Sequence, residues 1–165
     1  GSGCLLLSCL SELEHAVGIG IDISQEAIIQ ARENAQLLKL KERSEFFRSN
    51  WFEGLRNLKF DLILCNPPYI SREEKQDLQD EVLIFDPEKA LFSDKKGLAD
   101  YEIIFSNLAK HLNSNGIALI EIGYNQLERV SDLAHLSNLH VYNVSNDLQG
   151  IPRCMILCRP NNTIL

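Results

Sequence analysis

The sequence predicts an α/β fold in which helices cross a mostly parallel sheet. Apolar runs of strand length alternate with amphipathic stretches of helix length along most of the 165 residues, an order typical of parallel sheets. The runs at 60–65 and 117–122 have few polar interruptions, as strands buried on both faces do. With 45% hydrophobic residues, the chain has the length for one domain with a substantial core.

The first third of the chain predicts two helices and two strands. Ser24 is the expected N-cap of the second helix, whose apolar residues recur at helical spacing. These elements are a helix over 5–14, a strand over 16–22 that ends in Asp22, a helix with the stripe Ile28, Ala31, Ala35 and Leu38, and a strand over 44–48.

The rest of the chain predicts three more strands and two more helices after the strand at 60–65. The segment 70–97 is expected to be a long charged loop, longer than a compact domain usually contains without a functional reason. The later elements are a helix over 98–112 with Tyr101, Ile104, Leu108 and Leu112 on one face, a turn at 113–116, a strand over 117–122, a helix over 125–134, and a closing strand pair at 140–144 and 154–158.

Composition narrows the possible functions. The formal net charge is −7 and no block of Lys or Arg occurs, so charge offers no argument for direct binding to nucleic acid. No run of 18 apolar residues predicts a membrane span. The five cysteines are odd in number and form no C-x-x-C pair, and the four histidines have no ligand spacing. We therefore expect buried, reduced thiols, no metal site and a cytoplasmic location.

The most informative motif is Asn66–Pro67–Pro68–Tyr69, which directly follows the strand at 60–65. Open α/β sheets bind their ligands at the carboxyl ends of strands. Two prolines remove two backbone donors and leave rigid carbonyls that can only accept hydrogen bonds. Asn66 adds an acceptor oxygen and Tyr69 adds a flat aromatic face. These residues suit a planar group that carries an NH2. Such a group is either an amide or a base with an exocyclic amine.

A second motif lies at the start of the sequence. Gly1, Ser2 and Gly3 precede an apolar helix, and backbone amides at such a helix start meet a ligand in nucleotide-binding α/β folds. Asp22 lies 19 positions after Gly3 and can accept hydrogen bonds from two vicinal ribose hydroxyls. A remnant of a cleaved tag could also give Gly-Ser here, and this motif alone would equally suit NAD.

These motifs, in this order, resemble the class I S-adenosylmethionine (SAM)-dependent methyltransferases, and more narrowly the release-factor glutamine methyltransferases. Further segments carry the resemblance as far as about Arg159. They are Glu81–Val82, Phe85–Asp86–Pro87 with Asp86 where the family usually has Glu, Ala90–Leu91, Gly97–Leu98 with Tyr101, Glu121–Ile122–Gly123 with Gln126, and the run from Asp147 to Arg153.

The resemblance implies a Rossmann-like domain with helices on both faces of a twisted, mostly parallel sheet and an antiparallel closing strand. It also implies that residues 1–165 form one catalytic domain that lacks the fold's first strand and the helical substrate-binding domain that precedes it in the family. SAM is the expected cofactor. The residues expected to bind it are Gly1, Ser2, Gly3, Asp22, Asn50 (where the family usually has Asp), Trp51 over the adenine, and Asn66.

The resemblance also implies a substrate and an acceptor site. Asn66, Pro67, Pro68 and Tyr69 would bind the glutamine of the Gly-Gly-Gln motif of a peptide-chain release factor, with Asn66, Pro67 and Tyr69 as the catalytic residues. The product would be N5-methylglutamine.

Two alternatives stay open. One is an N6-adenine or N2-guanine methyltransferase acting on DNA or RNA, which would need a basic flank that the sequence does not display. The other is a fragment that does not bind SAM and has no catalytic activity.

Overall fold

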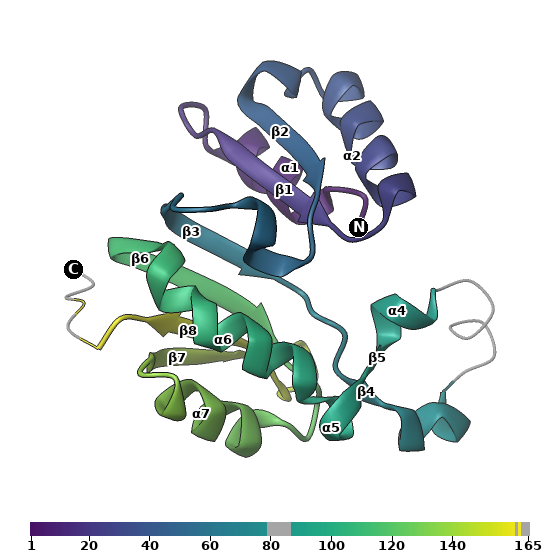
Figure 1. The fold of residues 1–165 in the computed structure, drawn as a ribbon, viewed down its shortest axis with the longest axis vertical. Helices are drawn as coiled ribbons and strands as arrows, with labels where there is room; N and C mark the ends of the chain where they lie inside the picture. The colour runs from purple at the N-terminus through teal and green to yellow at the C-terminus, as the bar shows by residue number, and fades with distance from the viewer. Residues whose placement is uncertain (79–86, 161, 163–165) are drawn as a thin grey trace. The chain divides into compact units, whose positions relative to one another are not determined.

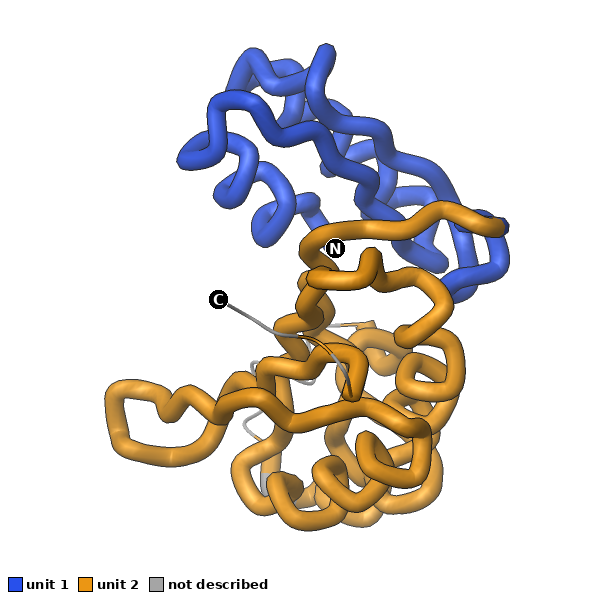
Figure 2. Tube along the Cα trace, turned by 90° about the vertical axis from the view of Figure 1, so that its left-hand side faces the viewer, with its two compact units in different colours: residues 1–56 blue, residues 57–165 orange. Residues whose placement is uncertain are grey.

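The computed structural model describes residues 1–78, 87–160 and 162. The chain forms two compact units, residues 1–56 and residues 57–165 (Figure 2). Each unit is described here by itself.

The first unit contains a pair of parallel strands accompanied by two helices (Figure 1). Its strands pair in register from Gly18 opposite Ser44 to Asp22 opposite Arg48, so both strands end at the same edge. The elements are α1 (Cys4–Glu12), β1 (Gly18–Asp22), α2 (Gln25–Leu37), β2 (Ser44–Arg48) and two short 3-10 helices, η1 (Lys41–Arg43) and η2 (Trp51–Gly54).

The helices of this unit form where the sequence predicts them, because their apolar stripes meet in one core. Ser24 caps α2, since its hydroxyl accepts a hydrogen bond from the Ala27 amide at 3.1 Å. Leu38 is exposed rather than buried, because α2 ends at Leu37 and Leu38 is its C-cap. The buried core consists of Leu7, Leu10, Ile28, Ala31, Ala35, Leu40 and Phe46.

The second unit contains a four-stranded sheet of order β3-β6-β8-β7 (Figure 1). β3 and β6 are parallel, and β8 runs antiparallel to both β6 and β7. The elements are β3 (Phe60–Cys65), β4 (Ile70–Ser71), η3 (Arg72–Asp77), α4 (Glu88–Leu91), β5 (Phe92–Ser93), α5 (Asp94–Gly97), α6 (Ala99–His111), β6 (Leu112–Glu121), α7 (Leu127–Leu136), β7 (His140–Asn146) and β8 (Pro152–Cys158).

The core of this unit lies between the sheet and helix α6. Tyr101, Ile104 and Leu108 are buried on one face of α6, as the helical spacing predicts. On the sheet, the side chains of Ile120 and Met155 are fully buried. The predicted α/β fold and the antiparallel closing pair of strands are therefore confirmed.

Two sequence expectations for this unit are wrong. The segment 70–97 is not a plain loop, because its described residues include β4, η3, α4, β5 and α5. The turn expected at 113–116 belongs to β6. The register between β3 and β6 shifts between Phe60 and Leu62, so β6 holds extra residues there without leaving the sheet. Among the described residues, no helix is both long enough and apolar enough to cross a membrane.

Candidate functional site

The N-P-P-Y segment leaves the carboxyl end of β3, as the sequence predicts. Cys65, the last residue of β3, pairs with Ile120, so the segment begins beside Glu121, the last residue of β6. The Asn66 side chain is exposed, Pro67 is buried and Tyr69 is half-buried. This arrangement leaves the Asn66 carboxamide accessible to a ligand while the following residues are fixed against the unit.

The Tyr69 side chain is held by the end of β6. Its hydroxyl donates a hydrogen bond to Glu121 Oε1 at 3.0 Å. The neighbouring Tyr101 hydroxyl, from α6, donates to the main-chain oxygen of Glu121 at 2.9 Å. The Arg153 guanidinium, on β8, donates to the carbonyl of Ile122 at 3.3 Å and forms an ion pair with Asp147 at 3.4 Å. Residues from three separate elements thus meet around one tyrosine.

The electrostatics of this region keep its tyrosine and cysteine side chains neutral. Burial raises the pKa of Tyr69, and the adjacent Glu121 carboxylate raises it further, although Arg153 opposes the shift. Burial also raises the pKa of Tyr101. At the end of β3, burial raises the pKa of the Cys65 thiol to about 12. At neutral pH the phenol of Tyr69 is therefore a hydrogen-bond donor, and Cys65 is not a thiolate nucleophile.

In the first unit, Asp22 lies at the carboxyl end of β1. Its Oδ1 accepts a hydrogen bond from the Ser24 amide at 2.8 Å, and its Oδ2 accepts one from the Gly1 amino group. The carboxylate has about four lone-pair sites, so two stay available for a ligand. Two vicinal ribose hydroxyls need that number, so the geometry is compatible with ribose binding by Asp22, which stays a prediction.

The glycine segment lies beside this carboxylate. Gly3 adopts φ 79°, in the left-handed region, and is the N-cap residue of α1. A Cβ at this position would lie 3.1 Å from the Ala31 side chain and from the Phe46 ring. Both the backbone angle and the close approach therefore favour glycine here. Ser2 is held through its carbonyl, which accepts a hydrogen bond from the Asn34 side chain at 3.0 Å.

Asn50 and Trp51 follow β2 at the same edge as Asp22. The Ser49 amide donates to the Asp22 carbonyl at 3.0 Å, which ties the two strand ends together. Asn50 is exposed, and its Nδ2 donates to Glu53 Oε1 at 2.9 Å. This hydrogen bond uses the Asn50 amide nitrogen, and the carboxamide oxygen is the atom of this side chain that can accept a hydrogen bond. Trp51 is half-buried and adopts φ 47°, a strained angle for a residue other than glycine.

The structure therefore brings the predicted residues together as two sets, one in each unit. Gly1, Ser2, Gly3, Asp22, Asn50 and Trp51 belong to the first unit, and Asn66, Pro67, Pro68 and Tyr69 belong to the second. Glu81, Val82, Phe85 and Asp86 lie outside the described residues.

The sequence pointed to Glu121 and Gln126 only as parts of family-like segments, without a role. The structure shows that both contact Tyr69. Their location at the end of a buried strand, where ligand sites form in α/β sheets, is the sequence signal that indicates them.

Two further expectations concern cysteines and metals. All five cysteines are free. Cys158 is buried, Cys9, Cys65 and Cys154 are partly buried, and Cys4 is exposed, so the expectation of buried thiols is wrong for Cys4. Among the described residues, no cluster of three or more His, Cys, Asp or Glu side chains could hold a metal ion.

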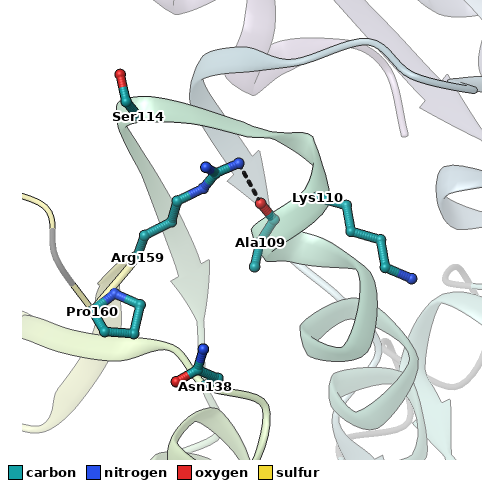
Figure 3. Close-up of a pocket in the computed structure, with 6 residues that line it drawn as sticks. All are labelled: Ala109, Lys110, Ser114, Asn138, Arg159 and Pro160. Carbon is teal, nitrogen blue, oxygen red and sulfur yellow. Dashed lines mark hydrogen bonds between the residues drawn. The ribbon is translucent and has the colours of Figure 1, made fainter.

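A surface hollow of about 480 Å³ lies elsewhere in the second unit, at the carboxyl end of α6 (Figure 3). Arg159 donates to the Ala109 carbonyl at 2.7 Å and so caps the end of this helix. Lys110 points away from Arg159 (Figure 3). Ser114, which also lines the hollow, lies near the start of β6. The Tyr69 hydroxyl contacts Glu121, at the opposite end of β6. The hollow thus contains none of the predicted site residues.

Residues 1–98 match the family model described as the methyltransferase small domain. The chain belongs to this family. Solved structures with a similar fold include the ribosomal protein L11 methylase of Lactobacillus delbrueckii subsp. bulgaricus, with a TM-score of 0.67 at 21% identity over 96% of this chain and 65% of that chain. Another is the catalytic domain of hMettl16 in complex with an RNA hairpin of the MAT2A 3′UTR, with a TM-score of 0.69 at 13% identity over 99% of this chain and 64% of that one. These likenesses confirm the Rossmann-like methyltransferase fold.

Among curated proteins, a bifunctional methyltransferase of Rickettsia felis is 43% identical over 98% of this chain and 31% of its own length. The release factor glutamine methyltransferases of Rhodospirillum rubrum and Caulobacter vibrioides are 36% and 37% identical over 96% and 94% of the chain. The chain covers 49% and 54% of those two proteins and 31% of the Rickettsia felis protein. It therefore spans about half or less of the length of these relatives. The family and these relatives identify a methyltransferase domain of the SAM-dependent type.

Proposed function

We propose that this domain transfers a methyl group from SAM to the side-chain amide nitrogen, N5, of the glutamine in the Gly-Gly-Gln motif of a peptide-chain release factor. The observation that carries the proposal is the N-P-P-Y segment, with an exposed Asn66 carboxamide next to a Tyr69 held in place by β6. The similarity to release factor glutamine methyltransferases supports the choice of substrate.

The residues of the first unit suit the binding of SAM. Asp22 has acceptor sites left for a ribose diol, the backbone at Gly1, Ser2 and Gly3 lies beside it, and the Asn50 oxygen can accept from the adenine amino group. Trp51 would cover the base. When bound, SAM supplies an activated methyl group with a neutral leaving group, so the reaction needs little acid–base catalysis.

The residues of the second unit suit a reaction at an amide nitrogen, which is a weak nucleophile. Its nitrogen lone pair is delocalised into the carbonyl, and hydrogen bonds that hold the two N–H groups can direct that lone pair. In this proposal the Asn66 side-chain oxygen and the Pro67 carbonyl each accept one N–H, and Tyr69 packs on the planar amide. The two prolines restrict the backbone that carries these acceptors.

A second candidate function is methylation of the exocyclic amine of adenine or guanine in DNA or RNA. The same acceptors at Asn66 and Pro67 would suit such an amine, and a protein with a similar fold is known in complex with an RNA hairpin. The net charge of −7 argues against this candidate, because the phosphate backbone attracts basic surfaces.

The test is a methyl-transfer assay with radiolabelled SAM and the longest natural chain that contains residues 1–165. We expect label on a release factor, and no label once the glutamine of its Gly-Gly-Gln motif is replaced. Label that favours nucleic acid over the release factor would refute the proposal. The free cysteines fit a reaction in the reducing cytoplasm.

A further inference from the structure

The main-chain carbonyl of Tyr69 faces the side chain of Gln126. Gln126 Nε2 donates to Tyr69 O at 2.8 Å, and Gln126 Oε1 accepts from the Gly123 amide at 3.1 Å. A carbonyl can only accept and a backbone N–H can only donate, so these two partners define which end of the carboxamide carries the nitrogen. The Gln126 amide is therefore fixed in one orientation.

Two glycines leave room for this amide. A Cβ at Gly97 would lie 2.1 Å from Tyr69 O and 2.6 Å from Gln126 Nε2. A Cβ at Gly123 would lie 2.6 Å from Gln126 Oε1 and 3.2 Å from the Tyr69 ring. Both substitutions would displace the Gln126 amide, and the one at Gly97 would also displace the backbone of Tyr69. The space around Gln126 thus admits a carboxamide in direct contact with the backbone of the N-P-P-Y segment.

Tyr69 is consequently held at two independent points, the hydroxyl by Glu121 and the carbonyl by Gln126. The rings of Pro67 and Pro68 fix two of the φ angles that separate Tyr69 from Asn66. Fewer backbone rotations are therefore available to absorb a displacement of Tyr69 before it reaches Asn66 and Pro67.

We propose that Gln126 is a positioning residue for methyl transfer, which aligns the acceptor groups of Asn66 and Pro67 by holding the Tyr69 carbonyl. The inference rests on the proposed function for the role of Asn66. Gln126 itself lies outside the N-P-P-Y segment and acts through it.

The decisive variant is Gln126→Glu, which keeps the shape of the side chain and places an oxygen against Tyr69 O. At about pH 8.5 the new carboxylate cannot donate to that carbonyl, so we expect kcat to fall about tenfold or more at saturating substrates. At about pH 6 a fraction of the carboxyl groups is protonated and donates again, so the ratio of variant to parent kcat should rise as the pH is lowered.

Several charged or titratable groups surround this position. They are Tyr69, Tyr101, Glu121 and Arg153. The parent contains the same groups, so the ratio of variant to parent kcat removes any pH dependence that the two proteins share. Gln126→Met is close in volume and has no titratable group, so it should lose kcat without recovery at low pH. Gln36→Glu, at an exposed position on α2, adds the same charge and should behave as the parent does.

Each outcome decides the inference. A fall in kcat that recovers at low pH in Gln126→Glu but not in Gln126→Met supports it. Three results overturn it: a kcat equal to that of the parent at every pH, a rise in KM with unchanged kcat, or a loss of the same size at both pH values. If Gln126→Glu does not fold, the kcat of Gln126→Met decides, and a parental value overturns the inference.

A substrate-independent readout separates this inference from the proposed function. If the parent does not methylate a release factor, the proposed function fails, and tyrosine-selective 13C NMR then tests Gln126 alone. In the longest natural chain that contains residues 1–165, the Tyr69 signal can be assigned from its loss in Tyr69→Phe. We expect this signal to move in Gln126→Glu at high pH and to return at low pH, while that of exposed Tyr142 does not move. An unmoved Tyr69 signal would overturn the inference.

Discussion

Replacement of Asn66 by alanine gives a direct test of the N-P-P-Y segment. The Asn66 side chain is exposed and has no hydrogen-bond partner among the described residues, so its removal should change the free energy of unfolding by no more than about 0.5 kcal/mol. If its oxygen holds one N–H of the acceptor amide, its loss should lower the rate of methyl transfer at least ~10²-fold, the scale for removing one positioned hydrogen-bonding group from a reaction centre.

The assay is single-turnover transfer of a radiolabelled methyl group at saturating SAM, so that any effect of Asn66 on SAM binding does not enter the rate. Asn115→Ala is the matched control, because Asn115 is also an exposed asparagine but lies near the start of β6. Both variants should unfold at the parental urea midpoint. Equal rates for Asn66→Ala and the parent would refute the role of Asn66 and indicate that the segment is only an exit from β3.

Two further predictions concern SAM binding and folding. Asp22→Ala should weaken calorimetric SAM binding by roughly 1.5–3 kcal/mol, the range for hydrogen bonds to a charged group; unchanged affinity would refute the assignment. Asn50→Asp alone should gain little affinity because Glu53 Oε1 accepts from Asn50 Nδ2 at 2.9 Å, so a gain should need Glu53→Gln as well. Within the described residues, β1 and β3 each have one paired neighbour. Unpaired strand edges invite aggregation, so residues 1–165 expressed alone should aggregate or unfold without cooperativity. Micromolar SAM binding together with a sharp unfolding transition would contradict this expectation.

The sequence predicted the elements that local or periodic residue patterns define. The strands at 44–48 and 60–65 match to the residue. The strand 117–122 was predicted in place but too short, because the residues Asn113–Gly116 resemble a turn. Pairing of Leu112 with Phe60 keeps them in β6.

The candidate site was predictable at the ends of strands and not in the residues that support it. Asp22 ends β1 and Asn66 directly follows β3, and the ends of strands are visible in a sequence. The contact between Gln126 and Tyr69 joins residues 57 positions apart, and it depends on the turn after β6 and on the backbone at Gly97. Neither propensity nor periodicity carries that information.

The close approach at Gly97 also limits how this sequence can evolve. Gly97 is buried with φ 80°, and even a single methyl group there would collide with the Tyr69 carbonyl oxygen. Its neighbours Lys95 and Lys96 also adopt left-handed angles, but their side chains are exposed. Neutral drift should therefore be free to exchange both lysines for glycine or asparagine, which relieve strain. At position 97 almost every substitution should be selected against, so among descendants of this sequence Gly97 should be retained longer than most other residues of the segment 70–97.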